Sequence, residues 1–186
     1  NTPDILTGAT AELTWALILA LAKNVTIDDQ AMRTGQWQTV VGTEIRNKTL
    51  GVIGLGRIGS EVAKVGKAFG MNVIAWSENL TAERAEKCGT TLVSKDDLFR
   101  QSDYVVVMVI QSDRTIGLVG AHEIGLMKSD AYLINPARGP IVDEAALVDA
   151  LKNNKIAGAG LDVYDEEPLP IDHPFRGLPN TVLMPH

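Results

Sequence analysis

Short apolar segments alternate with amphipathic stretches along most of the chain after residue 48. Apolar runs bounded by turn residues are typical of strands, and the longer amphipathic stretches between them are typical of helices. The pattern predicts strands over residues 49–54, 72–76, 91–93, 104–110, 131–135, 157–163 and 181–184. It predicts helices over residues 58–69, 82–88, 95–101 and 143–153. This alternation indicates an α/β domain, a doubly wound parallel sheet with helices on both faces.

The first part of the chain has a different pattern, because residues 7–24 read as a helix that is apolar on several faces. Leu13, Leu17 and Leu21 share one face, and neighbouring apolar residues extend to others. Such a helix is usually buried on several sides. We therefore expect it to lie at a domain junction or in a homodimer interface. A shorter helical stretch follows at residues 28–33.

Composition narrows the classes of partner. The 186 residues carry a formal net charge of −6, which argues against a nucleic-acid or anionic-membrane partner because both require a basic surface. The apolar run at residues 13–22 is shorter than the roughly 20 residues of a membrane span. Cys88 is the only cysteine, so no intrachain disulfide can form, and we expect a reducing, cytoplasmic setting. No metal site is expected, because the three histidines lack ligand spacing.

A glycine-rich turn follows the first predicted strand, where Gly54-Leu55-Gly56-Arg57-Ile58-Gly59 matches the spacing G-x-G-x-x-G. In this motif the first glycine permits a tight turn and the second lets the backbone approach a pyrophosphate. The third lets the following helix pack closely on the sheet. Because the turn lies between a strand and a helix, it predicts dinucleotide binding at Gly54, Gly56, Arg57, Ile58 and Gly59.

The choice between NAD and NADP depends on the end of the second predicted strand. NAD-binding folds usually place Asp or Glu there to bind the ribose, whereas this chain has Ser77 with Glu78 beside it. An NADP site would favour a nearby Arg or Lys that binds the 2′-phosphate, but the next basic residue is Arg84. We predict that NAD is the cofactor, with NADP as the alternative.

Three further segments place polar residues after later strands, where ligands gather in this architecture. They are Asn135-Pro136-Ala137-Arg138-Gly139, the stretch 161–168 from Leu161 to Pro168, and Met184-Pro185-His186. Together with the glycine-rich turn, they resemble the D-2-hydroxyacid dehydrogenases, a family that includes phosphoglycerate, glycerate and D-lactate dehydrogenases and glyoxylate/hydroxypyruvate reductases. The opening Asn1-Thr2-Pro3, followed by Ala11-Glu12, is similar to that family's crossover helix.

The resemblance implies an oxidoreductase that transfers hydride between a nicotinamide cofactor and a small 2-oxo or 2-hydroxy acid, with D stereochemistry. It implies that Arg138 binds the substrate, that His186 is the acid/base, and that Glu167 is its carboxylate partner. It further places the cofactor against Asp162, Val109, Pro136 and Ala137. The substrate domain is expected outside this chain, so residues 1–186 form the NAD-binding domain of a longer protein.

Alternatives remain for the histidine and for the function. His173 is the rival acid/base, although a histidine beside proline in a loop is more often structural, and His122 reads as a surface residue. An NAD(H)-sensing binding protein of the co-repressor type retains the same Arg-Glu-His set. Formate dehydrogenases that resemble the family carry Gln at the position of Glu167, which argues against formate oxidation.

Overall fold

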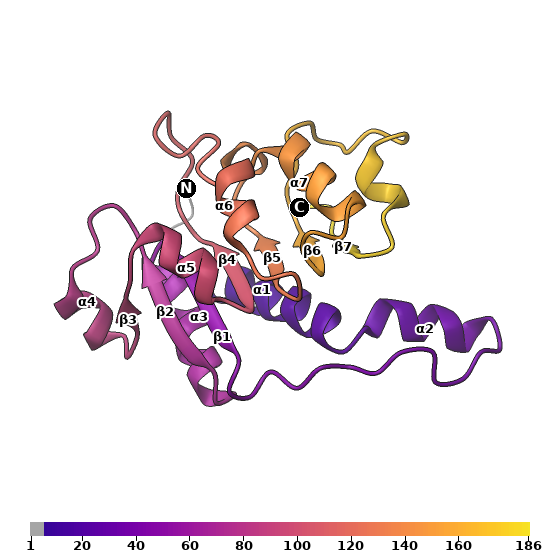
Figure 1. Ribbon diagram of the computed structural model, residues 1–186, viewed down its shortest axis with the longest axis horizontal. Helices are drawn as coiled ribbons and strands as arrows, with labels where there is room; N and C mark the ends of the chain where they lie inside the picture. The colour runs from indigo at the N-terminus through magenta and orange to yellow at the C-terminus, as the bar shows by residue number, and fades with distance from the viewer. Residues whose placement is uncertain (1–5) are drawn as a thin grey trace.

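The computed structural model describes residues 6–186, and the opening Asn1-Thr2-Pro3 lies outside the described residues. In the described part of the chain, seven strands form one sheet in the order β3-β2-β1-β4-β5-β6-β7 (Figure 1), and every neighbouring pair is parallel. The strands are β1 (Thr49–Ile53), β2 (Asn72–Trp76), β3 (Thr91–Leu92), β4 (Tyr104–Val107), β5 (Tyr132–Asn135), β6 (Gly158–Leu161) and β7 (Thr181–Leu183). The doubly wound α/β class predicted from the sequence is therefore confirmed.

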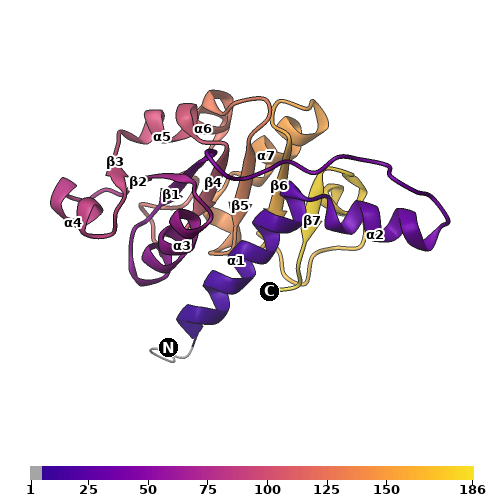
Figure 2. The same cartoon turned by 90° about the horizontal axis from the view of Figure 1, so that it is seen from below.

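Helices cover both faces of the sheet (Figure 2). One face carries α1 (Leu6–Ala22) and α3 (Arg57–Ala68), and the other carries α5 (Lys95–Gln101), α6 (Ala121–Leu126) and α7 (Glu144–Lys152). The remaining helices are α2 (Val25–Arg33), α4 (Ala82–Lys87) beside the edge strand β3, and two short 3-10 helices, η1 (Gly139–Ile141) and η2 (Pro174–Gly177).

Alternation along β4 shows how one strand serves two hydrophobic cores. Val105 and Val107 pack among α5, α6 and α7, whereas Tyr104 and Val106 pack among α1 and α3. Successive side chains of a strand point to opposite faces, so a strand buried on both faces needs an unbroken apolar sequence. The continuous run after residue 103 fulfils that requirement, although β4 ends at Val107 rather than at residue 110. Ile110 is exposed in the loop that follows.

Helix α1 is buried on more than one side, as its apolar pattern predicts. Trp15, Leu17, Ile18 and Leu21 are all buried, and the helix contacts α3 as well as β5, β6 and β7. No single helix in residues 6–186 is long and apolar enough to cross a membrane; only the bent pair Gly8–Ala22 and Val25–Arg33, with 61° between its halves, has the length and composition of a broken span.

The segment between α1 and β1 includes an arm, residues 23–43, that projects from the sheet (Figure 1). Helix α2 begins at Val25, earlier than the predicted residue 28, and none of its residues is buried. The return segment is fastened back to the end of α1, because Thr43 donates its backbone N–H to the Ala22 carbonyl at 2.7 Å. The arm exposes large apolar side chains that the described residues do not cover, namely Val25, Ile27, Met32, Trp37, Val40 and Val41.

Candidate functional site

The predicted site residues all follow the carboxyl ends of parallel strands, at one edge of the sheet. The strand order reverses between β1 and β4, and the helices after these two strands lie on opposite faces. In doubly wound sheets such a switch point opens a crevice in which ligands bind. The glycine-rich turn leaves β1 at this point, and Val109 follows β4 beside it.

Two glycines of the turn are required by close approaches between backbone segments. Gly54 has φ of +97°, and a Cβ there would lie 2.8 Å from the Met108 carbonyl and from Cγ1 of Val109. A Cβ on Gly59 would overlap the Gly54 carbonyl oxygen. Both positions therefore need glycine for the fold itself, since any side chain would push α3 away from β1 and β4.

Gly56 differs, because nothing in the described protein lies within 4 Å of the place where its Cβ would be. It is exposed at the N-cap of α3, and no side chain in residues 6–186 caps this helix end. The first N–H groups of a helix lack partners within the helix, and they attract an anion together with the helix dipole. Arg57 is also exposed at this end, whereas Ile58 packs into the apolar cluster under the turn. These features fit the pyrophosphate of a dinucleotide.

The position expected to contact the ribose lies next to this turn. Gly54 donates its backbone N–H to the Trp76 carbonyl at 2.8 Å, so Ser77 leaves β2 directly beside the glycine-rich turn. Ser77 is partly exposed and Glu78 is exposed. A ribose hydroxyl could therefore meet either a hydroxyl or a carboxylate side chain here.

The loop after β5 is held by a buried amide. Asn135 is buried; its Nδ2 donates to the Arg138 carbonyl at 2.9 Å, and its Oδ1 accepts the Ala137 N–H at 3.1 Å. Pro136 is buried beneath the loop, while the Arg138 side chain is exposed and Nη1 donates to the Ala137 carbonyl at 2.6 Å. The guanidinium therefore faces solvent with donors to spare, from a backbone that is fixed in place.

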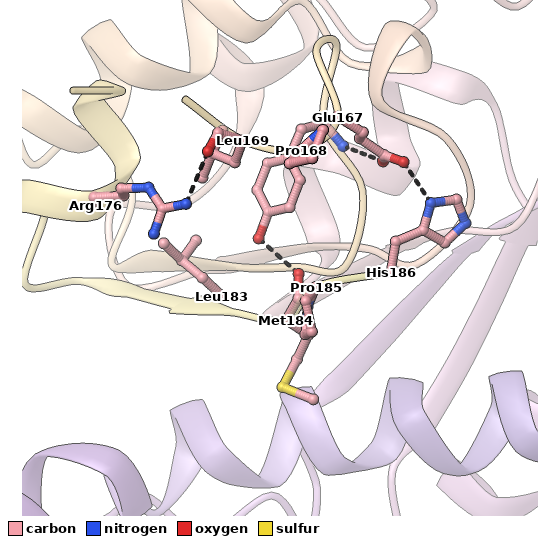
Figure 3. A pocket seen from close by; sticks show the side chains of 9 residues that line it. Glu167, Pro168, Leu169, Arg176, Leu183, Met184, Pro185 and His186 are labelled. Carbon is pink, nitrogen blue, oxygen red and sulfur yellow. Dashed lines mark hydrogen bonds and ion pairs between the residues drawn. The ribbon is translucent and has the colours of Figure 1, made fainter. Parts of the chain in front are cut away.

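Glu167 and His186 form a pair although 19 positions separate them in the sequence (Figure 3). Nδ1 of His186 donates to Oε2 of Glu167 at 2.6 Å, and Oε1 of Glu167 accepts the backbone N–H of Tyr164 at 3.0 Å. The hydrogen bond from His186 is the main cause that holds the pKa of the Glu167 carboxyl below its usual range, and Arg138 adds to this effect. The carboxylate is therefore ionised at neutral pH and orients the imidazole so that Nε2 is left for another partner.

Asp162 follows β6 and is buried near the pair. Burial raises the pKa of its carboxyl, while the imidazole charge and the backbone N–H of His186 act in the opposite direction. Beside the pair is a cavity of about 510 Å³. Its lining residues are Tyr164, Glu167, Pro168, Leu169, Arg176, Leu183, Met184, Pro185 and His186.

The other two histidines lie elsewhere. Nε2 of His173 bonds Glu144 at 2.8 Å, and Nδ1 accepts the backbone N–H of Phe175, so this ring caps η2. His122 is exposed on α6, with Asp96 as a neighbour at 3.4 Å. The contacts of His173 support its interpretation as a structural residue. Among residues 6–186, no three His, Cys, Asp or Glu side chains are grouped so that they could hold a metal ion.

Residues 15–186 match the family model described as "D-isomer specific 2-hydroxyacid dehydrogenase, NAD binding domain". The chain therefore belongs to the D-isomer specific 2-hydroxyacid dehydrogenase family. Within that family it corresponds to the NAD-binding domain, and the resemblance inferred from its motifs is confirmed.

Proteins similar to this chain carry the names of oxidoreductases. The chain is 47% identical to a glyoxylate reductase of Aeropyrum pernix and 46% identical to a D-3-phosphoglycerate dehydrogenase of Archaeoglobus fulgidus. These matches cover 100% of this chain but only 58% and 36% of the two relatives. A solved D-isomer specific 2-hydroxyacid dehydrogenase from Xanthobacter autotrophicus, in complex with NADPH and MES, superposes with a TM-score of 0.87 at 32% identity. That match covers 98% of this chain and 58% of the solved chain.

The sequence does not indicate the roles of three residues that shape the site, although all three lie within the segments 135–139 and 161–168. Asn135 fixes the loop of Arg138, and Gly139 and Tyr164 bring two loops into contact. An amide directly after a strand and a glycine directly after the arginine are weak signals, because both residue types are common in turns. Their importance depends on contacts between segments that are distant in the sequence.

Proposed function

We propose that this chain is the cofactor domain of an NAD-dependent dehydrogenase that interconverts a small 2-oxo acid and the corresponding D-2-hydroxy acid. The proposal rests above all on the His186–Glu167 pair, held at 2.6 Å on the same edge of the sheet as the glycine-rich turn. A histidine–carboxylate pair at the ligand-binding edge of a dinucleotide fold can exchange a proton with a substrate while hydride is transferred.

The bound cofactor supplies or accepts the hydride, and the residues of this chain bind, orient and transfer the proton. When a 2-oxo acid is reduced, negative charge develops on the carbonyl oxygen, so the acid must be protonated beforehand. Glu167 places a carboxylate at Nδ1 of His186 and leaves Nε2 to face the substrate. In the oxidative direction the neutral ring accepts the hydroxyl proton.

Arg138 is proposed to hold the carboxylate of the substrate. Its guanidinium is exposed on the loop after β5, and its charge reaches Glu167, which places it in the same electrostatic environment as the acid–base pair. A planar guanidinium can bind a carboxylate through two parallel hydrogen bonds. A substrate held in this way has its carbonyl group adjacent to the arginine, which suits acids with the oxo group at carbon 2.

The cofactor-binding residues in the proposal are Gly54, Gly56, Arg57, Ile58, Gly59, Ser77, Val109, Pro136, Ala137 and Asp162. The substrate domain is proposed to lie outside residues 1–186, since the chain spans only 58% and 36% of the two relatives above. A homodimer is proposed as well, because the arm exposes apolar side chains such as Trp37 and Val41. The single cysteine suits a reducing compartment such as the cytoplasm.

The test is turnover by the full-length protein. NADH oxidation is followed by absorbance with glyoxylate, hydroxypyruvate, pyruvate and phosphohydroxypyruvate, and chirality of the product is determined for the best substrate. We expect saturable turnover of at least one acid and a D product. NADH binding without turnover of any acid contradicts the proposal and favours a cofactor-sensing protein instead.

A further inference from the structure

Three separate loops carry the proposed catalytic side chains, and each must hold its residue in register with the other two. Arg138 follows β5, Glu167 follows β6 and His186 follows β7. The three side chains are exposed, so their own packing does little to fix them. An acid–base pair with an opposing guanidinium loses rate steeply when one member moves by about 1 Å. The contacts that connect these loops come from a residue packed beneath them.

Tyr164 contacts all three loops. Its backbone N–H donates to Oε1 of Glu167 at 3.0 Å. Its hydroxyl donates to the carbonyl of Met184, two residues before His186, at 2.9 Å, and lies 3.3 Å from the Leu161 carbonyl. Its own carbonyl lies so close to Gly139, the neighbour of Arg138, that a Cβ on that glycine would overlap it.

The side chain of Tyr164 is well anchored for such a task. It is buried at 7% exposure, and its ring packs at 6.4 Å from the ring of Phe175 in the core beneath the loops. Burial raises the pKa of the hydroxyl to about 12, so the group remains a hydrogen-bond donor throughout the physiological range. The donated proton therefore goes to a carbonyl oxygen at any pH at which the enzyme works.

From these contacts we propose that Tyr164 is a positioning residue that sets the geometry of the His186–Glu167 pair. It is not a catalytic residue, since its hydroxyl is occupied by a backbone carbonyl. The hydroxyl fixes the strand end that presents the imidazole, and the backbone N–H fixes the carboxylate. This inference rests on the proposed function for its kinetic consequences, whereas the geometry of the pair can be measured without turnover.

The experiment compares four forms of the full-length protein: wild type, Tyr164→Phe, Tyr132→Phe and Glu167→Gln. Tyr164→Phe keeps the buried ring and the backbone N–H and removes only the hydroxyl. Tyr132→Phe is the matched control, because it removes the same group at the start of β5, on the opposite edge of the sheet from the site. Glu167→Gln serves as the reference for a pair without its negative charge.

The first readout is the proton NMR titration of the His186 ring without cofactor, assigned by its disappearance in His186→Gln. The charged groups that bear on this ring are Glu167 and Asp162, with Arg138 acting through Glu167 and Arg176 on the shared cavity wall. We expect the titration midpoint in Tyr164→Phe to move from the wild-type value towards that of Glu167→Gln. The midpoint in Tyr132→Phe should equal that of wild type.

The second readout is kinetic. We expect Tyr164→Phe to lower kcat about fivefold, the size of one net hydrogen bond, and to leave KM for NADH unchanged. The alkaline limb of its kcat/KM profile should move in the same direction as in Glu167→Gln. The double variant Tyr164→Phe/Glu167→Gln should show the same limb as Glu167→Gln alone. A Tyr164→Phe protein with wild-type titration and wild-type pH profile overturns the inference, even if its thermal stability falls. Absence of turnover in wild type contradicts the proposed function, and the NMR titration then decides the positioning role by itself.

Discussion

The most discriminating prediction concerns Gly56, because the structure separates its role from that of Gly59. Both glycines belong to the same turn, but a side chain at Gly56 meets open space and a side chain at Gly59 meets the Gly54 carbonyl. Gly56 also has φ of −84°, which any residue can adopt. If Gly56 is glycine for the sake of a ligand, its replacement should reduce cofactor binding and leave the fold intact.

Serine is the most informative replacement. At the N-cap of α3 a serine hydroxyl accepts a backbone N–H of the first turn, so Gly56→Ser should keep the free energy of unfolding within about 0.5 kcal/mol of wild type. The same N–H groups are those that the pyrophosphate would use, and the side chain also occupies its space. Loss of one or more hydrogen bonds to a charged group costs about 1.5–3 kcal/mol, or a roughly 10- to 150-fold weaker Kd for NADH.

Gly59→Ala is the control with the opposite outcome. Its Cβ overlaps backbone rather than a flexible side chain, so α3 must shift away from β1. Overpacking of this kind costs about 1–3 kcal/mol of stability. Denaturant unfolding and NADH calorimetry on both variants of the full-length protein test the pair of predictions. Wild-type NADH affinity in a folded Gly56→Ser protein refutes the cofactor site, and destabilisation equal to that of Gly59→Ala refutes the argument from open space.

Three other outcomes follow from the site. Glu167→Gln should move the alkaline limb of 2-oxo acid reduction to lower pH, because it removes the negative charge beside the ring that has to be protonated. An unmoved limb in kcat/KM against pH contradicts this pairing. His186→Ala should lower kcat roughly 10²- to 10⁴-fold, the range for a lost general acid, and near-normal activity would exclude His186 from that role. NADH should be preferred over NADPH in kcat/KM, since a 2′-phosphate beside Ser77 would meet the negative charge of Glu78; an equal or higher value for NADPH rules out this reading.

The fold was predictable because its strands and helices have distinct periodicities. Every predicted strand exists, and the unbroken apolar run of β4 correctly indicated burial on both faces. The ends of the elements were less accurate: β6 occupies Gly158–Leu161 rather than 157–163, and α2 begins at Val25 rather than at residue 28. The residue at which a strand ends depends on where its pairing with the neighbouring strand stops, and that information is not local in the sequence.

The sequence supplies the candidate site residues, but it does not show which other residues hold them in position. The roles of Arg138, Glu167 and His186 are implied by the family resemblance of their motifs, and the structure places these residues after β5, β6 and β7, with His186 bonded to Glu167. Nothing in the sequence distinguishes Tyr164 from any aromatic residue of a core, because its three contacts join segments up to 25 positions apart. Such contacts follow from tertiary packing, which periodicity does not encode.

The two parts of the proposed site lie on either side of the end of β4. The glycine-rich turn belongs to the half of the sheet formed by β1 and its neighbours, and the Arg138, Glu167 and His186 loops belong to β5, β6 and β7. Between them lies the end of β4, where Val109 packs so close to Gly54 that a Cβ on this glycine would touch it. A ligand that reaches from the N-terminus of α3 to the imidazole must therefore cross the end of β4. An extended dinucleotide is suited to such a span, with its pyrophosphate at the helix and its reactive ring near the acid–base pair.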